Sequence, residues 1–268
     1  MHILSQEFVM GRDFKDINKI PDINESIYSF DMLGEAARNQ KQSDIYYSAY
    51  ENAIEEVGKI NLIKNTNNGV SIKISALCPS YEMRKYEDIK LTLIPKLISL
   101  TELGISKDVE ITIDAEEQDR LSISLEIIKI MAQSQKIKDW PGFGMALQAY
   151  GKRSMDSINW LEKVLKTRSS MHLRLVKGAY WDYEIKNSQV LSHIDYSVFT
   201  KKSITDLSYL ACAKRIFEID SIYPKFATHN AHTVSAINYL GKDKRYEFQR
   251  LFGMGELLYK CADKVIGN

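Results

Sequence analysis

Seven short segments of the chain read as β-strands, and in several of them hydrophobic and polar residues alternate with the period of two that is typical of a strand. The segments are 26–30, 70–77, 109–115, 143–150, 172–179, 225–230 and 246–251. Between them, apolar residues three and four positions apart indicate amphipathic helices, for example Leu121, Leu125, Ile128 and Met131, or Ile158, Leu161 and Leu165. Strands that alternate with helices predict a parallel sheet, either doubly wound or closed as a (βα)8 barrel.

Local signals mark the ends of two of these helices. Ser154 stands at an N-cap position, and Gly104 stands where the preceding helix through Leu93, Leu97 and Leu100 is expected to end. No linker rich in Pro, Gly or Ser divides the chain, and the polar segment 61–69 is too short to separate domains. We therefore expect one domain over residues 1–268.

Polar residues inside the strands distinguish the two sheet architectures. A central strand of a doubly wound sheet is covered by helices on both faces and is apolar throughout. In 109–115, however, the odd positions are apolar, whereas Glu110, Thr112 and Asp114 share the other face. This alternation favours a barrel in which the apolar faces meet the helices and the polar faces line the interior.

Four polar residues lie late in their strands on the predicted interior face: Lys73, Asp114, Gln148 and Arg174. Active sites of (βα)8 barrels lie at the carboxyl ends of the strands. A cation, a carboxylate, an amide and a guanidinium are therefore expected together at this opening of the barrel, its mouth. Internal salt bridges would explain any one of these residues. The four together favour a ligand with carbonyl, ring-nitrogen and phosphate groups.

Composition and charge exclude several classes of protein. The chain has 36 Lys and Arg against 35 Asp and Glu, so its net charge of +1 gives no global field for nucleic acid or an anionic membrane. No apolar stretch is long enough to span a bilayer, and no signal peptide is recognisable. Three cysteines far apart suit a reducing compartment. We expect a cytoplasmic protein that docks on a membrane surface at most.

The histidines and acidic pairs give weaker signals. His229 and His232, with Asp114, would suit a metal-dependent barrel hydrolase, but no HxH or HExxH spacing supports a metal site, and we expect no metal. His172 is expected at a surface or strand edge. Glu116 and Glu117 are expected to form the solvated start of the next helix.

Longer blocks of sequence resemble one family. VSIKISAL followed by Pro and Tyr-Glu, ITIDAEEQDRL, LRLVKGAYWDYEIK, YPKFATHNAHT and EFQRLFGMGELLY occur in the order and spacing of the proline dehydrogenase domain of bifunctional bacterial proline utilisation flavoenzymes. The resemblance covers nearly the whole chain, from QEFV and FDMLGEAA onward. It implies a (βα)8 barrel that binds FAD, oxidises L-proline to Δ1-pyrroline-5-carboxylate by hydride transfer to flavin N5, and passes electrons to a membrane quinone.

The resemblance also assigns residues to the cofactor. It places Gln148 at the flavin pyrimidine edge, Arg174 near flavin N5, and Thr228, His229 and Asn230 on the phosphate and adenosine side. The residues that would line the isoalloxazine ring and the rest of the cofactor are Val176, Lys177, Gly178, Ala179, Tyr180 and Trp181.

The substrate residues follow from the same resemblance. Lys73 would pair with the proline carboxylate, and Asp114 would hold the lysine and the flavin network in register. The proline ring would be walled by Leu175, Tyr180 and Leu251.

The sequence departs from the family at its end and at two positions. The family continues with an eighth strand and a last helix, whose arginine pair binds the substrate carboxylate, whereas this sequence stops at VIGN and contains no Arg-Arg. We therefore expect an incomplete barrel, with a non-catalytic fragment that forms homo-oligomers through its open edge as the alternative. Cys78 and Phe252 stand where the family usually has His.

Overall fold

Seven parallel strands form one curled sheet in this computed structural model, which describes residues 10–11, 26–32, 34–168 and 170–266. The strands lie in chain order across the sheet, and each pairs in parallel with the next. They are β1 (Ser29–Asp31), β2 (Gly69–Ile72), β3 (Glu110–Ile113), β4 (Phe143–Gln148), β5 (Met171–Val176), β6 (Ile222–Ala227) and β7 (Glu247–Gln249). The predicted (βα)8-type architecture is confirmed, with seven strands in the described part. The block QEFV lies outside the described residues.

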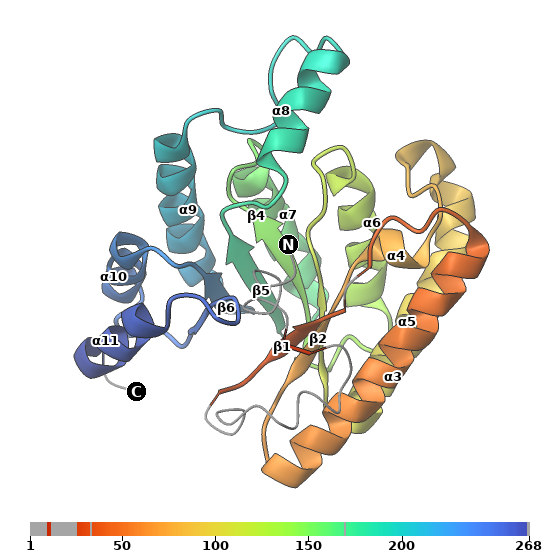
Figure 1. Ribbon diagram of the computed structural model, residues 1–268, viewed down its shortest axis with the longest axis horizontal. Coiled ribbons are helices and arrows are strands. Elements are labelled where there is room, and N and C mark those ends of the chain that lie inside the picture. The colour runs from red at the N-terminus through yellow and green to blue at the C-terminus, as the bar shows by residue number, and fades with distance from the viewer. Residues whose placement is uncertain (1–9, 12–25, 33, 169, 267–268) are drawn as a thin grey trace.

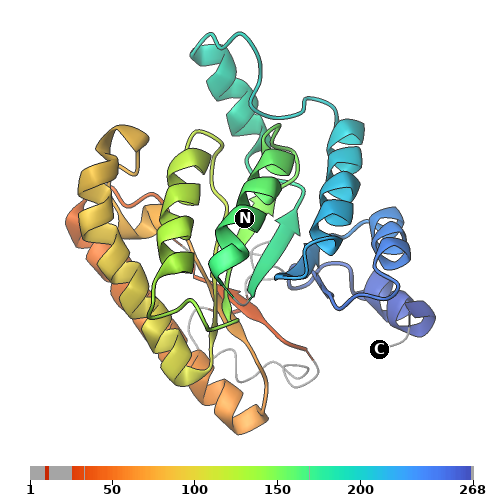
Figure 2. The same ribbon diagram turned by 180° about the vertical axis from the view of Figure 1, so that it is seen from behind.

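Long helices cover the outer face of the sheet (Figures 1 and 2). They are α3 (Gln40–Lys64), α5 (Tyr86–Lys107), α6 (Leu121–Gln133), α7 (Ser154–Val164), α9 (Lys202–Phe217) and α10 (Ala231–Leu240). Helix α8 (Trp181–Val190) projects away from the barrel beyond the carboxyl end of β5, and α11 (Glu256–Ile266) packs beside α10. None of the described helices is both long and apolar enough to cross a bilayer.

The hydrophobic core fills the layer between the sheet and these helices. Ile158, Leu161 and Leu165 are buried in it, as the helical spacing predicted. In α6 the predicted Ile128 and Met131 are buried, but the buried face is rotated toward Ile123 and Ile127. Leu121 and Leu125 are only partly buried.

Two predicted helix ends are wrong. Helix α5 continues through Gly104 to Lys107, and Asp108 takes the left-handed conformation that ends it. Gly104 is required for close packing, since a Cβ there would lie 2.8 Å from the carbonyl oxygen of Val109. Ser154 is the first residue of α7 and not its cap, because its hydroxyl donates to the Gln148 carbonyl at 2.6 Å.

The predicted strand 70–77 is also too long. Strand β2 ends at Ile72, and the next residues form the one-turn helix α4 (Ile74–Leu77). The chain turns here because the backbone N–H of Ser75 donates to the Glu116 carboxylate at 2.9 Å. Lys73 therefore lies where the strand gives way to the turn, at the carboxyl end of the sheet. Two 3-10 turns, η1 (Met83–Lys85) and η2 (Leu165–Thr167), complete the described elements.

Candidate active site

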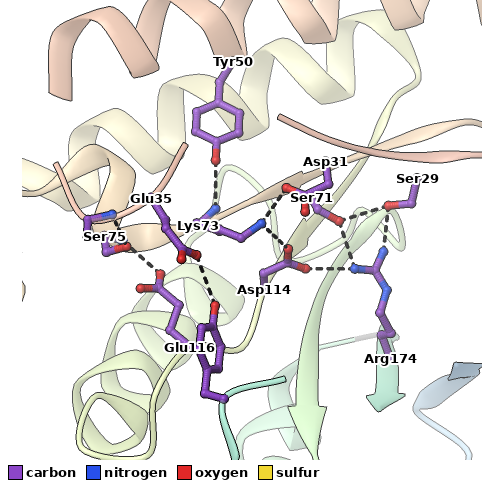
Figure 3. A network of polar contacts seen from close by, with 12 residues as sticks. Ser29, Asp31, Glu35, Tyr50, Ser71, Lys73, Ser75, Asp114, Glu116 and Arg174 are labelled. Atoms are coloured by element: carbon purple, nitrogen blue, oxygen red, sulfur yellow. Dashed lines mark hydrogen bonds and ion pairs between the residues drawn. The ribbon is translucent and has the colours of Figure 1, made fainter. Parts of the chain in front are cut away.

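Four charged side chains meet inside the barrel at the carboxyl ends of its strands, and we call them the upper cluster: Asp31, Lys73, Asp114 and Arg174 (Figure 3). One oxygen of Asp114 accepts from an Arg174 terminal nitrogen at 2.8 Å, and the other accepts from Lys73 Nζ at 3.2 Å. The interior parity predicted from sequence therefore brings Lys73, Asp114 and Arg174 together. A single carboxylate is shared by two cations.

The guanidinium of Arg174 reaches from β5 across the barrel interior. It donates to the hydroxyls of Ser29 on β1 and Ser71 on β2, at 2.7 and 2.9 Å. Its Nε donates to Gln249 Oε1 on β7 at 2.7 Å. Because a guanidinium is planar, contacts to three strands besides β3 fix both its position and its plane.

Lys73 is held by its backbone and its side chain. Its N–H donates to the Tyr50 hydroxyl at 3.0 Å, and its ammonium lies 2.5 Å from Asp31 and is 14% exposed. Burial alone would lower the pKa of Lys73, but the charges of Asp114 and Asp31 outweigh it and raise the pKa above its ordinary value. Lys73 is therefore a permanent cation at the mouth.

Sequence reasoning missed Asp31. It lies on the same face of β1 as Ser29, and its side chain is 51% exposed at the mouth. Partial burial and the nearby charge of Asp114 raise the pKa of Asp31, while Lys73 opposes this shift. The alternation rule applied to residues 29–31 would have found it, but three residues are too few to establish a pattern.

Glu116 and Gln148 form a second polar group beside the upper cluster. The expectation that Glu116 is solvated is wrong, because its side chain is buried and its carboxylate pairs with Arg120 at 2.6 Å. Gln148 donates to the Glu116 carbonyl at 2.8 Å and accepts from the Ala179 N–H at 2.9 Å. Both ends of the Gln148 amide are thereby anchored, and it forms no hydrogen bond with Lys73, Asp114 or Arg174.

The turn between β5 and α8 brings backbone close to the mouth. Gly178 has a φ of 145°, and a Cβ there would lie 2.4 Å from the ring of Tyr150, so only glycine fits. Lys177 forms an ion pair with Asp206. Ala179 is held by Gln148.

The side chains at the two ends of this turn face different partners. Val176 ends β5 and is partly buried. The indole N–H of Trp181 donates to the Phe199 carbonyl at 3.0 Å.

The end of β6 leads directly into α10. Thr228 is buried, and the Asn230 side chain caps the helix by accepting from the Thr233 N–H at 3.0 Å. The first helical residues, Ala231 and His232, are exposed. A helix N-terminus with exposed first residues is a favourable place for an anionic group.

The metal-site pattern is not assembled. His229 Nε2 accepts from the Leu251 N–H at 2.9 Å, which occupies that ring nitrogen, and burial together with Arg250 lowers the pKa of His229. Among the described residues, no group of three His, Cys, Asp or Glu side chains is placed to hold a metal ion. The hydrolase alternative therefore lacks a ligand cluster in this part of the chain.

The placement of His172 corrects another expectation. It is buried inside the barrel, where its Nε2 lies 2.8 Å from the Thr112 hydroxyl. Burial and the charges of Lys225 and Arg174 lower the pKa of His172 well below its ordinary value. The ring fits only because β4 carries Gly144, where a Cβ would lie 1.8 Å from it.

The three predicted wall residues differ in placement. Leu175 is fully buried in the core, on the strand face opposite Arg174, so it does not line the mouth. The Tyr180 hydroxyl donates to Glu35 at 3.2 Å, and burial and the charge of Glu35 raise the pKa of Tyr180. Leu251 follows β7 and is 63% exposed.

Comparison with known proteins gives consistent matches over the whole chain. The sequence profile of the family described as proline dehydrogenase matches residues 15–265. Bifunctional protein PutA of Klebsiella aerogenes is 41% identical over 279 residues, covering 100% of this chain and 21% of that protein.

Two solved structures share the fold closely. A crystal structure of a mutant PutA from Bradyrhizobium japonicum has a TM-score of 0.90 and 39% identity, over 99% of this chain and 28% of that one. A structure of PutA with proline bound in remote sites has a TM-score of 0.89 and 37% identity, with the same coverage. The chain spans about a fifth of the length of the curated relatives it matches. The chain belongs to the proline dehydrogenase family.

Proposed function

We propose that this chain carries the site for FAD-dependent oxidation of L-proline to Δ1-pyrroline-5-carboxylate. Membership of the family supports the reaction class. The observation that carries the proposal is the upper cluster, in which a partly buried carboxylate holds a lysine and an arginine at the carboxyl end of a (βα)8-type barrel. FAD, when bound, would accept at N5 the hydride from the proline carbon next to nitrogen.

The residues around the mouth fit such a cofactor. The positive φ at Gly178 lets the backbone approach a flat ring, and the amide of Gln148 is anchored for contact with a ring edge. Lys177, Thr228 and the N-terminus of α10 suit the phosphates, with His229 and Asn230 on the same side. Val176, Ala179, Tyr180 and Trp181 belong to the same turn and complete the proposed cofactor wall.

Arg174 and Lys73 have separate proposed roles. The Arg174 guanidinium would place positive charge beside the ring and favour negative charge on it. Lys73 would bind the proline carboxylate, and Asp114 would hold both cations in place. Tyr180 and Leu251 would contact the proline ring. Leu175 is not assigned to the substrate site, because it lies in the core.

An absorption experiment tests this function. The purified protein is titrated with FAD and then, without oxygen, with L-proline. A visible flavin band that bleaches with proline supports the proposal, and Lys73→Met should remove the bleaching while the band remains. A band that never bleaches would indicate a non-catalytic flavin platform, and the absence of any bound flavin would overturn the proposal.

The remaining partners are proposals that rest on the same reaction. Reduced flavin needs an electron acceptor, and a membrane quinone would require the protein to approach the membrane surface from the cytoplasm. Quinone-dependent reoxidation with and without vesicles tests this step. Sedimentation of the purified protein tests whether it forms a homo-oligomer.

A further inference from the structure

A second group of charges lies deeper in the barrel, toward the amino-terminal ends of the strands, and we call it the lower cluster: Glu110, Lys225 and Glu247. Lys225 Nζ on β6 lies 2.6 Å from Glu110 on β3 and 3.3 Å from Glu247 on β7. Its side chain is only 6% exposed. The lower cluster thus joins three strands through a lysine that is largely withdrawn from solvent, while its two glutamates are only partly buried.

Gln249 connects the lower cluster to the upper one. It lies two residues after Glu247 on β7, and its Nε2 donates to Glu247 Oε1 at 2.8 Å. Its Oε1 accepts from Arg174 Nε at 2.7 Å. The amide has only one workable orientation, because arginine Nε can only donate and an ionised Glu247 can only accept.

The hydrogen bond at Nε determines how the plane of the guanidinium is oriented. Nε is the donor nearest the aliphatic stem, so a fixed acceptor there sets the plane in which the two terminal nitrogens lie. Those nitrogens reach Asp114, Ser71 and Ser29. Among the described residues, Gln249 alone accepts a hydrogen bond from Arg174 Nε.

We propose that Gln249, braced by Glu247 and Lys225, is a positioning residue that fixes the plane of the Arg174 guanidinium. Its effect on proline oxidation rests on the proposed function, whereas its effect on Arg174 does not. Gln249 acts through Arg174 and does not itself need to touch the substrate.

Two substitutions separate hydrogen bonding from charge. Gln249→Met keeps the length of the side chain but removes the acceptor and the donor. Gln249→Glu keeps an acceptor for Arg174 but adds a negative charge beside it and opposite Glu247. Gln189→Met is the matched control, since Gln189 lies exposed on α8, away from both clusters.

The first measurement needs no flavin. In protein labelled with 15N-arginine, the Nε–H signal of Arg174 is assigned by its loss in Arg174→Lys. Its exchange with solvent should be at least about tenfold faster in Gln249→Met than in the wild type or Gln189→Met, because a hydrogen bond of about 1.4 kcal/mol is lost. An unchanged exchange rate in folded Gln249→Met overturns the proposal.

The second measurement follows bound FAD. The Gln249→Glu carboxylate would offset the positive charge of Arg174, so the two-electron reduction equilibrium should become about tenfold less favourable, about 30 mV more negative. Gln249→Met should lower kcat more than it raises KM. An unchanged potential in Gln249→Glu contradicts the proposal. If the wild type binds no FAD, the proposed function fails and the exchange measurement alone decides the role of Gln249.

Discussion

The upper and lower clusters both pair basic side chains with carboxylates, but they differ in the ratio of cations to carboxylates. In the lower cluster one lysine lies between two carboxylates and is almost fully withdrawn from solvent. In the upper cluster one carboxylate serves two cations, and Asp31 is half exposed at the mouth. A lysine buried between two carboxylates stabilises the barrel, whereas the cations at the mouth remain within reach of a ligand.

The two cations of the upper cluster do not use all of their hydrogen-bond donors. Lys73 Nζ donates to Asp31 and Asp114, and Arg174 donates four hydrogen bonds. A lysine has three N–H donors and an arginine has five, so each keeps one without a hydrogen-bond acceptor in the described part of the chain. A ligand carboxylate or ring nitrogen at the mouth would meet these donors.

The largest expected effect is the loss of stability when the lower cluster is broken. Lys225→Met leaves Glu110 and Glu247 facing each other without a cation, so the free energy of unfolding should fall by about 3–5 kcal/mol. Urea unfolding followed by circular dichroism measures the loss. Lys244→Met, on the exposed side of the barrel, is the control and should change stability by less than about 0.5 kcal/mol. Equal stabilities of the Lys225 and Lys244 variants would show that the lower cluster has no structural role.

Substitution of Arg174 should affect chemistry more than folding. Arg174→Lys keeps a positive charge but loses the planar fork, so the rate of flavin reduction by proline should fall about 100-fold. Stopped-flow absorbance without oxygen measures that rate, and thermal unfolding reports stability. The assignment of Arg174 to the reacting ring would be wrong if the rate stayed within about threefold of wild type.

A pH experiment examines the buried imidazole between the two clusters. Because the folded-state pKa of His172 lies below its unfolded value of about 6.5, the unfolded state binds the proton more tightly below that pH. Stability should therefore fall as pH drops below about 6.5, by at most about 1.4 kcal/mol per pH unit from this group. His172→Gln should flatten this part of the curve, and His193→Gln, at an exposed site, should leave it unchanged.

The smallest expected effect concerns Asp31. In the proposed site its carboxylate would compete with the substrate carboxylate for Lys73, so Asp31→Asn should lower the apparent KM for proline by less than about fivefold. Steady-state assays with a dye acceptor give the KM. An increase in KM would mean instead that Asp31 holds Lys73 in its binding position.

Several features of the fold followed from local pattern, and others did not. The parallel sheet followed from strands that alternate with helices, and the interior placement of Lys73, Asp114 and Arg174 followed from period-two alternation. Gly104 and Ser154 were misjudged because both residues favour helix ends in general, while packing against Val109 and bonding to Gln148 determined their actual positions.

The sequence by itself determined that Lys73, Asp114 and Arg174 face the barrel interior and which family the motif blocks resemble, because alternation and residue order are properties of the chain. Only the tertiary structure decided which interior charges are closed off and which remain open at the mouth. Lys225 and Lys73 both lie in polar positions of their segments, yet Lys225 meets Glu110 from a strand 115 residues away in sequence, and Lys73 meets Asp31 at the solvent edge. Such partners depend on how the sheet curls, which brings distant strands within hydrogen-bonding distance.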